Sequence, residues 1–122
     1  MAGTLTISTL SDGTNSTSAT NPIRGSAKVW VQFNASGTIA SSYNVSSVTV
    51  NASNDFTINF TTAMSNANYS IVGTAGGGAS NSDPRTIGPS NANPTTSACR
   101  VTVTYTTTPS AVGYNSIAIF SS

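Results

Sequence analysis

Residues 55–61 have the sequence Asp-Phe-Thr-Ile-Asn-Phe-Thr, in which apolar and polar side chains alternate. Successive side chains of a β-strand point to opposite faces, so this alternation is typical of a strand with one buried face. We expect the buried face to consist of Phe56, Ile58 and Phe60, with the polar residues between them facing solvent. The stretch therefore predicts a β protein.

The same alternation recurs in residues 27–33 and 98–106. The expected inward residues are Ala27, Val29, Val31, Phe33, Cys99, Val101, Val103 and Tyr105. Weaker strand patterns occupy residues 4–10, 45–50, 69–74 and 114–120. Residues 34–42 are expected to form a connection, and residues 63–67 leave room for a single helical turn. About seven short strands with turn-rich connections predict an all-β fold, an antiparallel β-sandwich of jelly-roll-like type.

The length of 122 residues predicts one structural domain. A polar stretch separates the first strand pattern from the others, so we expect residues 1–22 to form an N-terminal strand or arm and residues 23–122 to form the sandwich. Residues 74–97 are rich in Gly and Pro and carry almost no apolar side chain except Ile87. Long loops in compact domains usually have a function, so we expect the contacts that determine specificity to lie in this segment.

Charge and cysteine content exclude several partners. The net charge is +1, and the four basic residues are scattered, whereas nucleic acids and anionic membrane surfaces require clustered Lys and Arg. The sequence has one cysteine, so no disulfide can form within the chain. We expect a protein that binds neither nucleic acid nor membrane and gains stability by associating with copies of itself.

The sequence offers little for catalysis. It contains no His, which excludes the usual nucleophilic triads, and a single Cys, which together with the lack of His removes common zinc and copper sites. The carboxylates are Asp12, Asp55 and Asp83. Hydrolysis of a glycosidic bond needs two carboxylates roughly 5 to 9.5 Å apart. Asp55 with Asp83, or a pair formed across subunits, is the arrangement that the sequence allows. We expect no enzyme, no cofactor and no metal site, and we expect Cys99 to be a small buried apolar residue.

Two features predict an interface. In residues 114–120, Ile117 and Ile119 lie on one face while Tyr114, Ala118 and Phe120 lie on the other, so a partner should cover the second face. Trp30 lies opposite the core face; it is either half-covered by a loop or serves as an anchor for a partner or a sugar. The candidate contact residues are Lys28, Trp30, Gln32, Arg85, Ile87, Tyr114 and Phe120.

Several stretches together resemble a module of tailed-bacteriophage virion proteins. They are Lys-Val-Trp-Val-Gln-Phe-Asn at 28–34, Gly-Thr-Ile at 37–39, Ser-Tyr-Asn-Val-Ser-Ser-Val at 42–48, Asp-Phe-Thr-Ile-Asn-Phe-Thr-Thr-Ala-Met at 55–64 and Ala-Asn-Tyr-Ser-Ile at 67–71. The opening Met-Ala-Gly-Thr-Leu-Thr-Ile is also similar to short members of this tail-fibre-domain family. The resemblance covers about residues 27–72 and does not extend to residues 74–97.

The resemblance implies a non-enzymatic structural protein of the virion, exposed on the particle as a homotrimer. A tail fibre or fibre tip that contacts the host surface is one role it implies. A capsid decoration (cement) protein that binds other virion proteins is the alternative, and a carbohydrate-binding module that recognises a host-surface glycan is a third possibility. The first residues lack the pattern of a signal peptide, so we expect assembly in the host cytoplasm.

Overall fold

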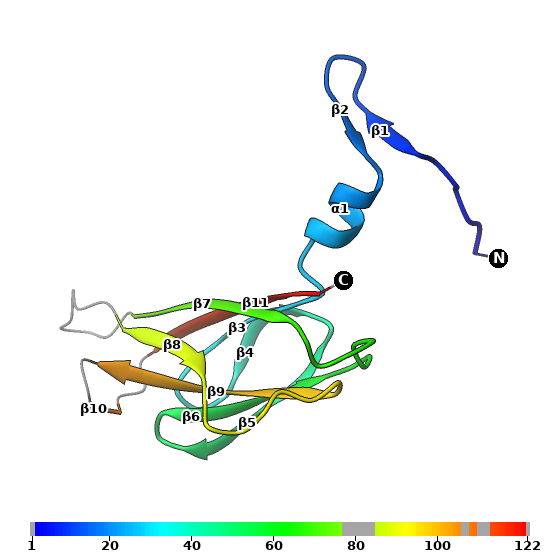
Figure 1. The fold of residues 1–122 in the computed structure, drawn as a ribbon. Coiled ribbons are helices and arrows are strands. Elements are labelled where there is room, and N and C mark those ends of the chain that lie inside the picture. Colours follow the sequence, from blue (N-terminus) through cyan, green and yellow to red (C-terminus); the bar gives the residue numbers. More distant parts are fainter. Residues whose placement is uncertain (1, 77–84, 106–107, 110–112, 122) are drawn as a thin grey trace.

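The computed structural model of the chain describes residues 2–76, 85–105, 108–109 and 113–121. Two antiparallel sheets pack face to face, and an N-terminal segment projects from them (Figure 1). The predicted all-β, antiparallel fold is confirmed. The described residues form eleven strands rather than about seven, because several connections contain short strands that the alternation did not predict.

We call the two main layers sheet I and sheet II. Sheet I has the order β4-β3-β11-β7, with bounds β3 (Val29–Phe33), β4 (Ile39–Tyr43), β7 (Ser70–Gly76) and β11 (Tyr114–Phe120). Sheet II has the order β10-β9-β6-β5, with bounds β5 (Val45–Ala52), β6 (Asp55–Phe60), β9 (Ala98–Tyr105) and β10 (Thr108–Pro109). Strand β8 (Thr86–Pro89) pairs with the other side of β9.

The core lies between the two sheets and consists of the inward faces of their strands. Phe33 of sheet I meets Phe56 of sheet II edge-on, with ring centroids 5.0 Å apart and an interplanar angle of 68°. The predicted inward residues of β3, β6 and β9 are buried: Val29, Val31, Phe33, Phe56, Ile58, Phe60, Cys99, Val101 and Val103. Ala27 precedes β3 and is half-buried, and the side chain of Tyr105 lies outside the described part of the chain.

Asn44 forms the corner at which the chain passes from sheet I to sheet II. It has a φ of 57°, a left-handed conformation that Asn tolerates better than most residues. Its side-chain Nδ2 donates to the carbonyls of Lys28 at 3.3 Å and Thr62 at 3.1 Å, and its Oδ1 accepts from the Thr62 N–H at 2.7 Å. One polar side chain therefore holds three chain segments together at this corner.

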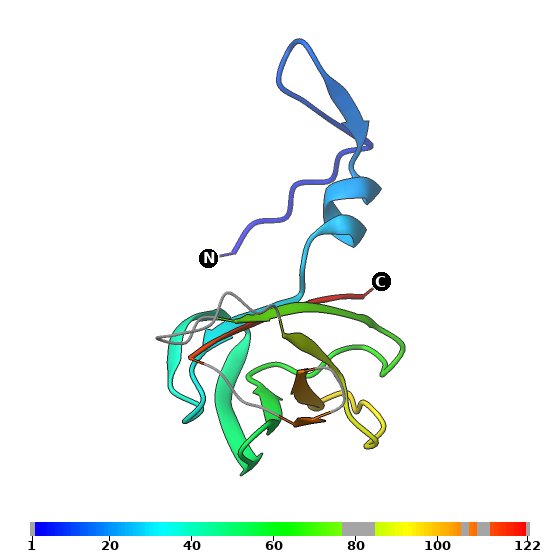
Figure 2. The same ribbon diagram turned by 90° about the vertical axis from the view of Figure 1, so that its left-hand side faces the viewer.

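The N-terminal segment is a hairpin followed by a short helix, with strands β1 (Thr9–Ser11) and β2 (Ser16–Ser18) and helix α1 (Thr20–Gly25). Both views show it rising away from sheet I (Figures 1 and 2). Because α1 spans the predicted boundary at residue 22, we define residues 2–26 as the arm. The helix was not predicted because six residues are too few to form an apolar stripe.

Residues 74–97 are not the single long loop that was predicted. Residues 74–76 belong to β7, residues 86–89 form β8, and residues 77–84 lie outside the described residues. Strand β8 was missed because Thr-Ile-Gly-Pro is too short to show an alternation. Residues 34–42 likewise contain most of β4, and residues 63–67 contain no helical turn.

Candidate functional site

The outer face of sheet I carries a row of apolar side chains. Trp30 is paired with Tyr43 on one side and Ala118 on the other, and Ala118 is paired with Val72. Directly opposed residues of antiparallel strands face the same side, so the four residues cross the sheet in a line. Tyr43 is 58%, Val72 52% and Trp30 39% exposed. We call these four residues the apolar row.

A shallow hollow of about 270 Å³ adjoins the apolar row where β7 lies beside β11. It is lined by Val72, Gly73, Thr74, Ser116, Ile117 and Ala118. The hollow exists because the outward side chains of this part of the sheet are small. Gly73, which is paired with the inward-facing Ile117, adds no side chain. A protruding apolar side chain from another molecule can therefore contact the sheet closely here.

Four other predicted contact residues lie on the same side of sheet I. Tyr114 is 43% exposed and Phe120 is half-buried, and both share the outward face of β11 with Ala118. Gln32 opposes Ser116 next to the apolar row. Lys28 is half-buried, and its ammonium donates to the Ile23 carbonyl and to Ser26 Oγ at 3.0 Å. Their proposed contacts with a partner remain predictions.

The remaining two predicted residues lie elsewhere. Ile87 is 7% exposed and belongs to the core, so its prediction as a surface contact is wrong; its position in β8, paired with Val103, turns the side chain inward. Arg85 is half-buried beside β8, and its N–H donates to the Ala75 carbonyl at 3.1 Å. Neither residue belongs to the apolar row.

Sequence reasoning missed two members of the apolar row, Tyr43 and Val72. Tyr43 directly follows residues 34–42, which were predicted to be a connection, and it is the last residue of β4. Val72 alternates with Ile71 and Gly73 in a weak strand pattern, and this alternation could have placed it on the outward face. Only the strand register brings both residues beside Trp30 and Ala118.

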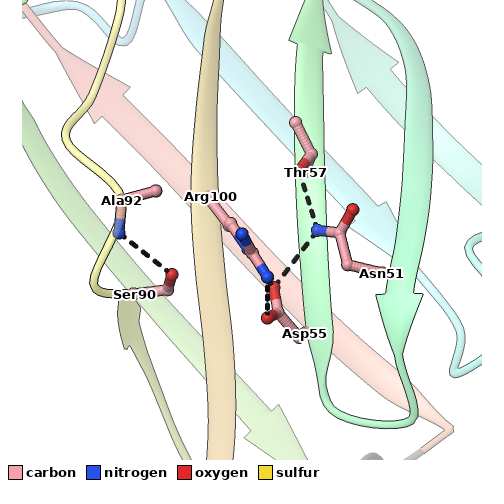
Figure 3. Close-up of polar contacts among 6 residues, drawn as sticks. All are labelled: Asn51, Asp55, Thr57, Ser90, Ala92 and Arg100. Carbon is pink, nitrogen blue, oxygen red and sulfur yellow. Dashed lines mark hydrogen bonds and ion pairs between the residues drawn. The ribbon is translucent and has the colours of Figure 1, made fainter.

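The outer face of sheet II is polar and holds an ion pair. Arg100 Nε and Nη2 donate to the two carboxylate oxygens of Asp55 at 2.8 and 2.6 Å, and Asn51 Nδ2 donates to the same carboxylate at 3.2 Å (Figure 3). The hydrogen bonds from Arg100 lower the pKa of Asp55, so this carboxylate stays ionised at neutral pH. A group of this kind is poorly suited to act as a general acid, and the Asp83 of the considered hydrolytic pair lies outside the described residues.

Replacing Asp55 by Asn is expected to destabilise the protein at pH 7 and to have less effect in acid. Because the pKa of Asp55 is lowered on folding, its contribution to stability is present above the pKa of an unfolded carboxyl group, about 4, and is lost as the pH falls through the folded value. Urea unfolding of both proteins between pH 7 and pH 2 measures the difference. Asp12→Asn, which alters only a turn in the arm, should leave unfolding of the sandwich unchanged. If the loss of unfolding free energy in Asp55→Asn stayed constant down to pH 2, the lowered pKa of Asp55 would be contradicted.

The cysteine is buried as predicted. Cys99 is 1% exposed, and burial raises the pKa of its thiol to about 12, so the thiol stays protonated at neutral pH. Desolvation also raises the pKa of Tyr69 to about 12, and the single hydroxyl proton of Tyr69 is shared between the carbonyls of Thr95 and Ala98, at 2.9 and 3.1 Å from the hydroxyl oxygen. Cys99 thus contributes to core packing, and Tyr69 contributes hydrogen bonds to the backbone.

A larger cleft of about 520 Å³ opens at the corner between the sheets. It is lined by Lys28, Tyr43, Asn44, Thr61, Thr62, Ala63, Met64, Ser65 and Ser121. The cleft shares Tyr43 with the apolar row, so one aromatic side chain links a recess of mixed polar and apolar lining with an exposed apolar surface. This combination of an aromatic ring and polar groups suits a sugar as well as a protein surface.

The described residues contain no group of three or more His, Cys, Asp or Glu side chains placed to hold a metal ion. In the same part of the chain, no helix has the length and apolar character that crossing a membrane requires. No protein-family model, curated protein or solved structure matches this sequence or fold. The fold and surface thus define an all-β sandwich whose sheet I carries exposed apolar side chains on its outer face.

Proposed function

We propose that the chain is a non-enzymatic structural protein of a tailed-phage particle that assembles with copies of itself into a homotrimer. The apolar row on sheet I is the observation that carries this proposal. Contiguous apolar patches on a soluble protein mark interaction sites, and exposed aromatic residues are enriched at their centres. The sequence resemblance to the tail-fibre-domain module supports the phage particle as the setting.

Burial of an apolar face of ordinary interface size contributes substantially to association. A standard interface covers roughly 800 Å² on each partner. If rather more than half of that area is apolar, burial at about 25 cal/mol per Å² contributes on the order of 10 kcal/mol per subunit. This gain is reduced by the entropic cost of association, yet it is comparable with the net stability of a small domain.

Light scattering at micromolar concentration should give about three chains per particle for the unaltered protein. The double variant Trp30→Ser, Val72→Ser should dissociate into monomers, because both side chains lie exposed in the apolar row. Val50→Ser is the matched control, since Val50 is 42% exposed but lies on β5 of sheet II. A monomeric unaltered protein, or an unchanged mass for the double variant, would overturn the proposal.

The position on the particle follows from a second measurement. We propose a tail fibre or fibre tip, which as a free protein should bind host cells and appear at the tail in images of antibody-labelled particles. A capsid decoration protein is the alternative, and it should instead bind expanded capsids and raise their resistance to heat. Labelling on the head would replace the fibre proposal by the decoration role.

A glycan-binding module is the second candidate function, and the pair Trp30 and Tyr43 beside the corner cleft favours it. Sugars stack on exposed aromatic rings while their hydroxyl groups bind polar side chains nearby. A bound glycan should quench the fluorescence of Trp30, the one Trp of the chain. Absence of binding on a broad glycan array would dispose of this candidate.

A further inference from the structure

The arm exposes apolar side chains that have no core of their own. Leu5 is 82%, Ile23 66%, Leu10 50% and Ile7 40% exposed. A two-stranded hairpin such as β1-β2 is only marginally stable alone in water. These side chains therefore gain free energy if another surface covers them.

The arm does not obtain that cover from its own sandwich. Every hydrogen bond found for residues 2–22 stays within residues 2–26. Lys28, at the entrance to β3, donates to the Ile23 carbonyl and to Ser26 Oγ and so ties the end of α1 to the start of the sandwich. The arm consequently stands away from sheet I in both views (Figures 1 and 2).

The apolar row and its hollow complement the arm in size and chemistry. Leu5 and Ile7 are two residues apart, so they point to the same side when this segment lies extended against a surface. Seven extended residues span about 23 Å at 3.3 Å per residue, and the axes of four neighbouring strands span only about 14 Å. The hollow of about 270 Å³ is shallow and open, so a branched aliphatic side chain can rest in it against the sheet.

We propose that residues 2–8 of one copy lie across the apolar row of a second copy, with the side chain of Leu5 or Ile7 in the hollow between β7 and β11. A second copy is the occupant because the arm projects away from its own sheet I (Figures 1 and 2), whereas the matching surface is present on every other copy. This inference rests on the proposed self-assembly and identifies the segment that performs it.

Few charges accompany either surface. The charged residues of the arm are Asp12 and Arg24, both outside residues 2–8, and the carboxylate of Asp12 already accepts N–H groups of its own turn. Lys28 is the charged residue next to the apolar row and is engaged with the arm of its own chain. Burial of this contact therefore requires no charge to be removed from water.

Cross-linking between two differently substituted proteins tests the proposal. One carries Ile7→Cys, and the other carries Val72→Cys and is isotope-labelled so that mass spectrometry distinguishes the chains. Because Cys99 is buried, a short bismaleimide should react with the introduced thiols. The mixture should give a mixed cross-linked dimer, whereas Ile7→Cys mixed with Val50→Cys should give at least tenfold less.

The outcomes separate this inference from the proposed function. Leu5→Ser with Ile7→Ser should raise the concentration at which the trimer half-dissociates at least tenfold, with the folding of the sandwich unchanged by circular dichroism. Trimers that persist unchanged in this variant would overturn arm docking and leave self-assembly standing. The same conclusion would follow if one chain carrying both Ile7→Cys and Val72→Cys formed cross-links only within itself. A monomeric unaltered protein would overturn both, and an arm that cross-links only to another virion protein would overturn the second copy as occupant.

Discussion

Replacing Phe56 by Ala is expected to lower the free energy of unfolding by about 3–5 kcal/mol. Phe56 is fully buried and packs edge-on against Phe33 of the opposite sheet at 5.0 Å. The substitution removes apolar surface from the core and leaves a cavity between two layers that cannot close around it easily. A loss of this size approaches the whole net stability of a small domain, so the variant should be unfolded or nearly so at 37 °C.

Urea unfolding at a fixed protein concentration measures the effect, because association would otherwise add to the apparent stability. Val50→Ala is the control for loss of an apolar side chain from a strand, since Val50 is 42% exposed on β5. It should change the free energy of unfolding by less than about 1 kcal/mol. Similar losses for the two variants would contradict the placement of Phe56 at the centre of the core.

Replacing Gly73 by Ala is expected to cost about 3 kcal/mol, at the upper end of the usual range for overpacking. A Cβ atom at this position would lie 2.7 Å from the Ser116 carbonyl oxygen, 2.7 Å from Ile87 Cγ2 and 2.9 Å from Ile117 Cγ2. The carbonyl belongs to the backbone of β11, so relief requires β7 to move away from its paired strand. The hollow on the outer face would be deformed at the same time.

Gly88→Ala is the matched control for Gly73→Ala. Gly88 also lies in a strand, but nothing comes within 4 Å of a Cβ placed there, so the substitution should be neutral or slightly stabilising. Thermal unfolding of both variants gives the comparison. Equal melting temperatures would contradict the close approach of β7 to β11.

The parts of the fold that the sequence predicted are those in which one strand carries its own complete pattern. Residues 55–61, 27–33 and 98–106 alternate over enough positions to identify both the strand and its buried face, and β6, β3 and β9 confirm them. Such alternation stabilises the packing of two sheets directly, because every second side chain enters the core. Residues 114–120 were predicted to be apolar on both faces, and the face that carries Ile117 and Ile119 is the one buried in the core.

The elements that escaped prediction are short or depend on partners far away in the sequence. Strand β8 has four residues and α1 has six, which is less than the length at which a periodic pattern becomes distinct. The apolar row depends on the pairing of Trp30 with Tyr43 and of Ala118 with Val72. Such registers are tertiary information, and no local pattern within β4 or β7 contains them.

The polar partners of Asp55 show the same limit. Its carboxylate was considered together with Asp83, yet the structure gives it Arg100, which is 45 positions away in the chain. The pairing of β6 with β9 brings the two side chains together on the outer face of sheet II. The composition shows that the chain has few charged residues. The strand pairing determines which of these residues contact each other.

The junction between the arm and the sandwich has a mechanical consequence. The arm continues directly into β3, an interior strand that is hydrogen-bonded to β4 on one side and to β11 on the other. Tension along the arm is thus distributed over two ladders, whereas a tether attached to an edge strand can be peeled off bond by bond. In the proposed assembly, tension should therefore break the contacts between subunits before it pulls an arm out of its own domain.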